Sequence, residues 1–436
     1  MTGPAHVCVV GAGIAGLATA FLLRERARAQ GWNLELVVLE ARPEPGGHTR
    51  SDMVDGFLCE RGANGFLDNE PATLELVDRL GLRPRLQRAS EQAARRFIYY
   101  GGKMRELPTR PLAFLRSDIL SWRAKLRVAL EPLVRSRRDG ADETVDGFGR
   151  RRLGPDFTRY LLGPMVSGVF AGDARRLSGG PAGPAGTLHT LQGGMGELTG
   201  VLAAQLADVL RTGVRVRALG QSAGGFSLGT EQGEIRAEAV VLACPSYEAA
   251  AILAEIAPAE AELLGAIAYA PVDVVCQGYG LEGIERPCNG FGVLVPREEG
   301  IRSLGVLCSD QIFPGQAPAG FRLLRAIAGG AHDPAIARLG EAELRASVAA
   351  DLRALFGVHG EPRLHHVVRH EQGIAQYDVG HLGRVAAAER LERDLPGLLL
   401  TGAAYRGVSV NGCVKDAQRV VEALAQGLGR RPMASR

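Results

Sequence analysis

The segment HVCVVGAGIAGLATAFLLRERARA, residues 6–29, decides the fold of this chain of 436 residues. Apolar residues over 6–10 predict a short buried strand, and the apolar spacing over 17–29 predicts a helix. A glycine turn joins the two. Its first glycine permits a tight turn, its second lets the backbone approach a pyrophosphate, and its third lets helix and strand pack closely. The segment therefore predicts a Rossmann-type α/β domain that binds a dinucleotide.

A second strand supports this interpretation. Residues 34–39 are mostly apolar and predict a strand, and Glu40 stands at its carboxyl end. A carboxylate at that place accepts hydrogen bonds from both ribose hydroxyls and repels a 2′-phosphate. The pattern therefore argues against NADP.

The far end of the chain repeats the arrangement. Residues 398–401 predict a strand, a glycine-containing turn begins at Gly402, and residues 411–428 predict a helix. Between the two ends, residues 214–216 and 239–243 predict further strands, and the pairs 224–225 and 232–233 predict hairpin turns. The dinucleotide domain is therefore expected to be assembled from both ends of the sequence.

Composition narrows the functional classes. A net charge of +3 with interspersed charges gives no indication of nucleic acid as a partner. The seven cysteines lie mostly in apolar runs and are expected to be buried thiols in a reducing compartment. Neither a signal peptide nor an apolar run of bilayer length is recognisable, so we expect a cytoplasmic protein with at most peripheral membrane contact. No metal site is expected, because His365 and His366 lack partners at ligand spacing. Oligomeric state is left open.

Longer blocks carry a resemblance to a known family. Glu40 followed by Gly46-Gly47 resembles the second FAD fingerprint of the amine oxidase superfamily, although Glu44 stands where that pattern usually has arginine, and Arg42 is the nearby substitute. The more specific blocks resemble the protoporphyrinogen oxidase family and span nearly the whole chain. They are GFLCERGANGFLDNEP (56–71), RRFIYYGGKMRELP (95–108), PMVSGVFAGDARRLS (164–178), GFGVLVPREEGIRSLGVLCSDQIFP (290–314), IAQYDVGH (374–381) and AYRGVSVNGCV (404–414).

The resemblance implies an α/β fold with a split Rossmann-type FAD-binding domain, a mixed-sheet substrate domain and a helical subdomain. The expected ranges are 1–75, 187–250 and 386–428 for FAD binding, 76–108 and 251–385 for the substrate domain, 109–186 for a shortened membrane-facing helical subdomain, and 429–436 for a flexible tail.

It also implies a non-covalent FAD. The residues it assigns to the cofactor are Gly11, Ala12, Gly13, Ile14, Ala15, Gly16, Glu40, Ala41, Arg42, Gly46, Gly47, His48, Thr49, Gly62, Ala63, Asn64, Val214, Ala243, Gly402, Val408, Ser409 and Val410.

The implied reaction is oxidation of protoporphyrinogen IX to protoporphyrin IX, with hydride removal from a methylene bridge and oxygen as acceptor. Such a substrate is a broad apolar ring with propionate arms, so its site needs an apolar slot and a cation. Arg96 is the candidate propionate partner, because a guanidinium matches a carboxylate at two points. Asn64 is the candidate catalytic residue near the flavin, and Gly168 is expected to let a helix approach the substrate. Three lysines, none in the central or late strands, argue against an amine substrate.

Some segments depart from the family. Residues 110–138 predict basic amphipathic helices, which would suit an anionic lipid surface. Residues 179–186 are rich in Gly and Pro where relatives continue a helix, so the lid over the substrate is expected to be shortened and turnover reduced. His370 and Ala375 stand where relatives have tryptophan and proline. Alternatives are oxidation of coproporphyrinogen III, another flavin oxidase activity, or a catalytically weak flavin-binding protein.

Overall fold

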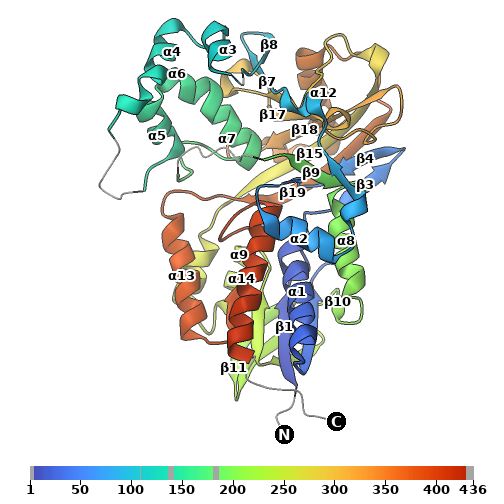
Figure 1. The fold of residues 1–436 in the computed structure, drawn as a ribbon, viewed down its shortest axis with the longest axis vertical. Coiled ribbons are helices and arrows are strands. Elements are labelled where there is room, and N and C mark those ends of the chain that lie inside the picture. Colours follow the sequence, from blue (N-terminus) through green and yellow to red (C-terminus); the bar gives the residue numbers. More distant parts are fainter. Residues whose placement is uncertain (1–3, 109, 136–141, 180–185, 429–436) are drawn as a thin grey trace.

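A parallel sheet forms one half of the molecule (Figure 1). The structure, a computed structural model, describes residues 4–108, 110–135, 142–179 and 186–428. The sheet has five parallel strands in the order β10-β2-β1-β14-β20. Their bounds are β1 Ala5–Val10, β2 Leu34–Glu40, β10 Leu210–Thr212, β14 Ala239–Leu242 and β20 Leu398–Leu400. The order places first and last segments of the chain in one sheet, as the sequence predicts.

Both faces of this sheet are covered, because its strands are apolar on both sides. Val7 and Val9 of β1 point toward the side of helices α1, α2, α8 and α14, whereas Cys8 and Val10 point toward the other side. The helices on the first side are α1 Ile14–Gln30, α2 Pro71–Arg79, α8 Met195–Gln205 and α14 Val410–Leu428.

The second side carries a small antiparallel sheet and three helices. These are β11 Val216–Ser222, β12 Gly225–Thr230, β13 Gly233–Ala237, α9 Ser246–Leu253, α10 Pro258–Gly265 and α13 His381–Asp394. The two predicted hairpin turns join these strands. The strand predicted over residues 214–216 begins only at Val216, as β11 of the antiparallel sheet, and the short strand β10 occupies the edge of the parallel sheet. Helix α10 lies beyond the predicted boundary at residue 250 but packs in the same core as β14.

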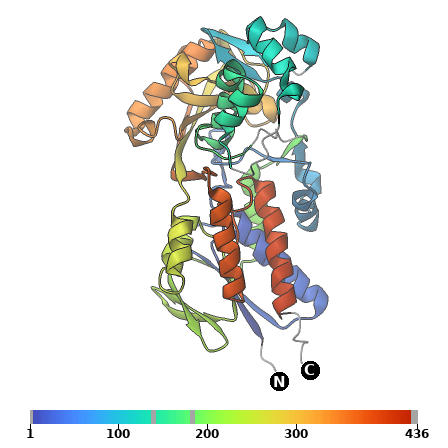
Figure 2. The same ribbon diagram turned by 90° about the vertical axis from the view of Figure 1, so that its left-hand side faces the viewer.

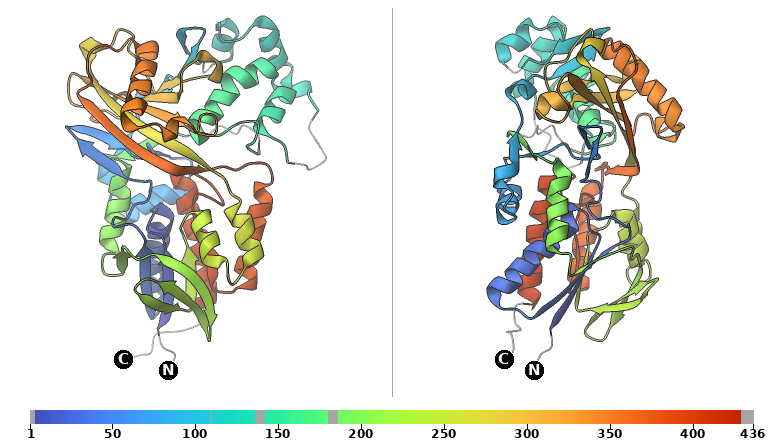
Figure 3. Two further views of the ribbon diagram at one scale, coloured as in Figure 1. Left: turned by 180° about the vertical axis from the view of Figure 1, so that it is seen from behind. Right: turned by 90° about the vertical axis from the view of Figure 1, so that its right-hand side faces the viewer.

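A seven-stranded mixed sheet forms the other half, in the order β19-β15-β18-β17-β16-β7-β8. The bounds are β7 Phe97–Tyr100, β8 Lys103–Glu106, β15 Tyr269–Gly280, β16 Gly292–Leu294, β17 Ser303–Cys308, β18 Phe321–Gly329 and β19 Leu364–Ala375. Helix α12 (Glu341–Phe356) covers its outer face, and α11 (Ser309–Ile312) follows β17. Figures 2 and 3 show this sheet with α12 above the parallel-sheet half, so the inner face of the long strands lies toward that half.

A cluster of short helices flanks the seven-stranded sheet. It comprises α3 Pro111–Arg116, α4 Trp122–Ala129, α5 Val145–Arg152, α6 Pro155–Phe157, a π-type turn Thr158–Leu162 and α7 Gly163–Phe170. The basic segment predicted over 110–138 is therefore two short helices with a break between them, where Lys125 Nζ donates to the carbonyls of Leu115 and Ser117. Residues 136–138, most of the Gly-Pro segment 179–186 and the tail 429–436 lie outside the described residues. No described helix is long and apolar enough to cross a bilayer.

Small elements connect the two halves. They are β3 Ser51–Val54, β4 Phe57–Glu60, β5 Phe66–Leu67, β6 Leu86–Arg88 and β9 Leu188–Leu191, with 3₁₀ turns at Arg83–Arg85, Glu91–Ala94, Glu131–Leu133, Leu281–Gly283, Arg297–Glu299 and Ile336–Arg338. Glu60, at the end of β4, is 2% exposed and ties the β3–β4 hairpin to α8. Its carboxyl accepts from Ser51 Oγ at 2.7 Å and from the Met195 amide at 2.8 Å.

Burial raises the pKa of Glu60 to about 7. An acid whose folded-state pKa lies above its unfolded value stabilises the fold at low pH and loses that contribution as pH rises from about 4.5 to about 7. Glu60→Gln keeps a neutral acceptor and should remove this loss. We expect the variant to gain stability over the wild type as pH rises from 5 to 8, by roughly 3 kcal/mol at about 1.4 kcal/mol per tenfold change in proton affinity. Thermal unfolding at a series of pH values measures this difference. Glu255→Gln, at an exposed position, is the control, and a Glu60→Gln curve parallel to it would contradict the assignment.

Candidate cofactor and substrate site

A cavity of about 630 Å³ lies between the carboxyl edge of the parallel sheet and the inner face of the seven-stranded sheet. In open parallel sheets, ligands bind outside the carboxyl ends of the strands, where the strand order reverses. Here that point lies between β1 and β14, and the residues that follow them, Gly11 and Ala243, both line the cavity. The parallel sheet therefore presents its usual ligand-binding edge to this cavity.

In the glycine turn after β1, two glycines pack directly against neighbouring backbone. Gly11 has φ +104°, and a Cβ there would lie 3.0 Å from the backbone of Ala243 and Cys244. A Cβ at Gly16 would lie 1.9 Å from the Gly11 carbonyl oxygen. At Gly13, in contrast, a Cβ would meet nothing within 4 Å. The turn is thus tight against the protein on one side and open toward the cavity on the other, beside the amino end of α1.

Glu40 closes the next corner of the cavity. The carboxylate, at the end of β2, accepts from the Ala12 amide at 2.7 Å and from the Arg42 amide at 2.9 Å. These bonds fix the carboxylate beside the glycine turn. It lies where the sequence predicts contact with a ribose.

The C-terminal segment supplies another wall. Gly402, Val408, Ser409, Val410 and the first turn of α14 line the cavity. Tyr377 holds this loop, since its hydroxyl accepts from the Gly407 amide at 2.8 Å and lies 2.9 Å from the Ala403 carbonyl. Cys413 also lines the cavity, and burial raises the pKa of its thiol to about 12. A neutral thiol is a poor nucleophile, which agrees with the expectation of a non-covalent cofactor.

The seven-stranded sheet provides an apolar wall with a single cation. Val272, Val274, Leu307 and Ile327 point into the cavity, because alternate residues of each strand share a face. Arg325 lies on the same face, between Cys276 and Leu307 in the strand register. Its guanidinium is 4% exposed and donates from Nε to the Glu60 carbonyl at 3.0 Å and from Nη2 to the Gly62 carbonyl at 2.5 Å.

The loop from Arg61 to Gly65 passes from β4 along the cavity. Asn64 lines the cavity, and both its Oδ1 and its Nδ2 are buried without a hydrogen-bond partner. Buried amides are normally satisfied, so the pair of orphaned atoms indicates a ligand. Arg61 is instead committed within the protein, since it makes two bonds of 2.7 Å to Asp52.

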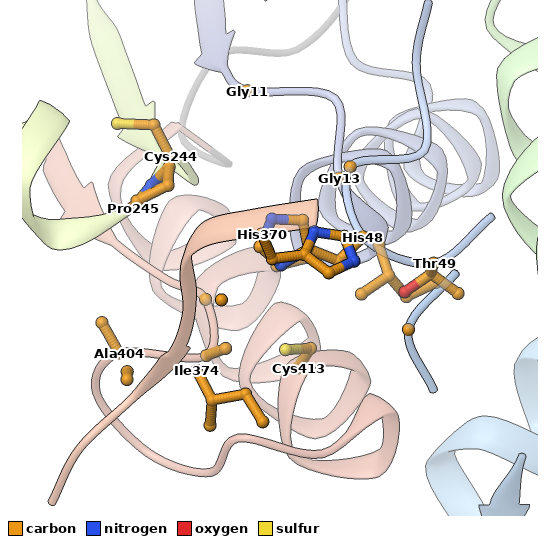
Figure 4. Close-up of a pocket in the computed structure, with 18 of the residues that line it drawn as sticks. Gly11, Gly13, His48, Thr49, Cys244, Pro245, His370, Ile374, Ala404 and Cys413 are labelled. Atoms are coloured by element: carbon orange, nitrogen blue, oxygen red, sulfur yellow. The ribbon is translucent and has the colours of Figure 1, made fainter. Parts of the chain in front are cut away.

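Two imidazoles meet inside the cavity. The ring centroids of His48 and His370 are 4.4 Å apart, and Figure 4 shows the two rings side by side, with Gly13 on one side and Ile374 and Cys413 on the other. His370 Nε2 donates to the Arg61 carbonyl at 2.8 Å. Burial, the neighbouring His370 and the charge of Arg42 lower the pKa of His48 to about 4, and burial lowers the pKa of His370. Both rings are therefore neutral at neutral pH.

Most of the residues predicted to bind the cofactor come together around this cavity. Those that line it are Gly11, Gly13, Ile14, Ala15, Glu40, Ala41, Arg42, Gly47, His48, Thr49, Gly62, Ala63, Asn64, Val214, Ala243, Gly402, Val408, Ser409 and Val410. Ala12, Gly16 and Gly46 stand behind the wall and shape it: the Gly46 amide donates to the Ala12 carbonyl at 2.8 Å.

The two predicted substrate residues lie elsewhere. Arg96 is exposed, and its guanidinium lies 5.4 Å from the centre of the Phe291 ring. Gly168 lets α7 approach β16, because a Cβ there would lie 2.3 Å from Leu294 Cδ2. Neither residue lines the cavity, whereas the neighbour of Gly168, Val169, does.

Sequence reasoning missed several cavity residues. Arg325, Tyr247 and Tyr269 were not singled out, whereas His370 and Ala375, the two positions noted as departures from the family, both line the cavity. One signal was present for Arg325: it stands in the apolar run of β18, and an arginine inside a buried strand requires a reason.

The described residues fit FAD. A glycine turn that is open at Gly13, a carboxylate at the end of β2 and the amino end of α14 offer partners for a pyrophosphate, a ribose and a flavin ring. The amide of Asn64, which has no partner among the described residues, offers a polar contact to a ligand. At Gly11 and Gly16 the protein's own backbone leaves no room for a side chain, whereas the open position at Gly13 leaves space for a ligand to approach the turn.

Comparisons with known proteins agree with this site. Residues 14–425 match the family described as flavin containing amine oxidoreductase. Protoporphyrinogen oxidase 2, chloroplastic/mitochondrial, of Arabidopsis thaliana is 29% identical over 96% of this chain and 94% of its own length. The chloroplastic protoporphyrinogen oxidase of Oryza sativa subsp. japonica is 31% identical over 95% and 87%. Coproporphyrinogen III oxidase of Bacillus subtilis (strain 168) is 27% identical over 96% and 97%.

Solved structures show the same fold. A protein of Exiguobacterium sp. 255-15, provisionally named a protoporphyrinogen oxidase, superposes with a TM-score of 0.84 at 24% identity, over 98% of this chain and all of its own. Reduced UDP-galactopyranose mutase gives a TM-score of 0.77 at 15% identity, over 99% and 96%. These findings confirm the predicted α/β FAD-binding fold, the flavin cofactor and the oxidoreductase class. The chain belongs to the flavin-containing amine oxidoreductase family.

Proposed function

We propose that this protein oxidises a porphyrinogen to the corresponding porphyrin with bound FAD, and that protoporphyrinogen IX is its substrate. The observation that carries the proposal is the cavity wall opposite the dinucleotide edge: four apolar side chains, one buried arginine and an orphaned asparagine amide. A broad apolar macrocycle with carboxylate arms would fit these features. The relatives named above support the substrate class, since each is named for a porphyrinogen.

The conversion of a porphyrinogen to a porphyrin removes six electrons, so FAD, when bound, would supply three successive two-electron oxidations and pass its electrons to the acceptor after each. The residues of the chain then have three tasks. The glycine turn and Glu40 hold the dinucleotide, Asn64 orients the ring of the substrate, and the apolar side chains of β15, β17 and β18 exclude water. Oxygen is the proposed acceptor. The second candidate is coproporphyrinogen III, favoured by the match to the Bacillus subtilis enzyme and by the presence of a buried arginine that a carboxylate-rich substrate would use.

The substrate is proposed to enter beside α7. Val169 lines the cavity and is also 55% exposed, so the cavity opens at this helix. The nearby helices α3 and α4 carry exposed apolar side chains together with exposed arginines. The apolar residues of this surface are Leu112, Leu115, Trp122, Leu126, Leu130 and Leu133.

An apolar surface edged with cations suits an anionic lipid bilayer, on which a porphyrinogen of low water solubility would be delivered. We propose peripheral membrane contact through α3 and α4.

Flavin bleaching tests the reaction. Under anaerobic conditions the yellow holoenzyme is mixed with protoporphyrinogen IX, coproporphyrinogen III or a set of amines. We expect protoporphyrinogen IX to cause loss of flavin absorbance, faster than coproporphyrinogen III does, and porphyrin fluorescence to grow by one porphyrin for every three equivalents of bound FAD that are reduced. Amines should cause no change. Bleaching by amines alone would refute the proposal, and faster bleaching by coproporphyrinogen III would replace the proposed substrate with the second candidate.

The glycine turn is tested through cofactor content. Gly16→Ala forces a Cβ against the Gly11 carbonyl, so the turn must move and the flavin-to-protein ratio after purification should fall at least severalfold. Gly200→Ala is the control, because a Cβ on α8 at that position meets nothing within 4 Å. Full flavin content in Gly16→Ala would show that the turn does not hold the cofactor.

Sedimentation with vesicles tests the membrane surface. Trp122→Glu combined with Leu126→Glu should abolish binding to vesicles that contain phosphatidylglycerol and leave flavin content unchanged, because both side chains project into solvent. Leu382→Glu alters an equally exposed leucine on α13 and serves as the control. If the double variant sediments as the wild type does, α3 and α4 are not the contact.

A further inference from the structure

Arg325 is a buried cation without a carboxylate partner among the residues that the structure describes. Its two hydrogen bonds go to backbone carbonyls, those of Glu60 and Gly62. The strand neighbour Arg322 shows the usual alternative: it is equally buried but lies 3.0 Å from Asp310. Burial raises the pKa of the Glu60 carboxyl and the charge of Arg325 opposes that rise, but the carboxyl accepts its hydrogen bonds from Ser51 and from the amino end of α8.

A charge in such a place is costly. Removing an ion from water without a paired counter-charge costs several kcal/mol, so buried arginines are normally matched. Burial lowers the pKa of Arg325, yet a guanidinium stays protonated in proteins. The protein keeps this unpaired charge at the surface of the cavity in spite of its desolvation cost. The missing counter-charge is therefore expected to come from a ligand.

The other cations of the cavity wall are differently placed. Arg61 is paired with Asp52, and Arg215 lies 3.0 Å from Glu248. Arg42 lies next to Glu40, on the side of the glycine turn where the dinucleotide is expected. Among the described arginines that line the cavity, Arg325 is the one on the seven-stranded sheet, and it lies among the apolar side chains that would face a substrate.

We propose that Arg325 binds a carboxylate side chain of the macrocyclic substrate inside the cavity. This assignment rests on the porphyrinogen oxidation proposed above. It differs from the sequence-based expectation, in which the exposed Arg96 has that role. The planar fork of Arg325 already uses Nε and Nη2 to hold the loop that carries Asn64. One guanidinium thus positions both the substrate arm and the asparagine amide.

Binding of the oxidised product separates this role from turnover. The probes are protoporphyrin IX, which has free carboxylates, and its dimethyl ester, each titrated against the holoenzyme by porphyrin fluorescence. We expect the wild type to bind the acid more tightly than the ester. Arg325→Gln should weaken binding of the acid by roughly tenfold or more, as the loss of a charged hydrogen bond does, and weaken binding of the ester much less, so the ratio of acid to ester affinity should fall. Arg325→Lys keeps the charge and should restore most of the preference.

Other outcomes overturn the assignment. An unchanged ratio of acid to ester affinity in Arg325→Gln, or an equal loss for both probes in Arg325→Gln and Arg325→Lys, would show that Arg325 has a structural role only. A shift of the flavin reduction potential in Arg325→Gln with an unchanged ratio would assign its charge to the cofactor. Loss of the preference in Arg96→Gln instead would return the role to Arg96. A wild type that binds neither probe and oxidises no porphyrinogen would refute the proposed function itself.

Discussion

The close approach of Gly16 to the Gly11 carbonyl is the contact on which the rest of the site depends. It presses the first turn of α1 against the end of β1, so the amino end of that helix and the open face of Gly13 point into the same space. Glu40 is then fixed by the Ala12 amide of the same turn. These contacts set the geometry of the carboxyl edge of the parallel sheet. The position of the cavity follows from them, because its other walls face that edge.

The seven-stranded sheet gives this edge its second surface. Its long strands β15 and β19 extend over the edge of the parallel sheet where the dinucleotide is expected. Alternate residues of β15 point to opposite faces, one lining the cavity and the other packing in the core. Val274 faces the cavity, while Val275 packs under α12. One strand thus contributes side chains both to the core under α12 and to the wall of the cavity between the two halves.

Local patterns predicted what depends on near neighbours in the chain. The turn from Gly11 to Gly16, Glu40 and the loop from Gly402 could be placed because strand, turn and helix follow one another within a few residues. The short strand β10 could not be predicted, since three residues carry no periodicity and only its pairing with β2 defines it. The contact of His370 with His48 and the placement of Arg325 in the cavity wall were equally hidden. They depend on the register between strands far apart in sequence, and Arg96, which a family block indicated, is exposed and does not line the cavity.

The electrostatics of the cavity connect these missed residues. Arg42 and Arg325 bring positive charge that no described carboxylate within ion-pairing distance balances, whereas Arg61 and Arg215 are matched by Asp52 and Glu248. The imidazoles of His48 and His370 lie among these cations, and this explains in part why the pKa of each is lowered and both stay neutral. Had the histidines been charged, the cavity would hold two more cations in a space that excludes water. A neutral pair leaves Arg42 and Arg325 as the cations of the described cavity wall without an ion-pair partner, one toward the dinucleotide and one toward the substrate, so the fold can accept anionic groups from two ligands without accumulating charge that neither can neutralise.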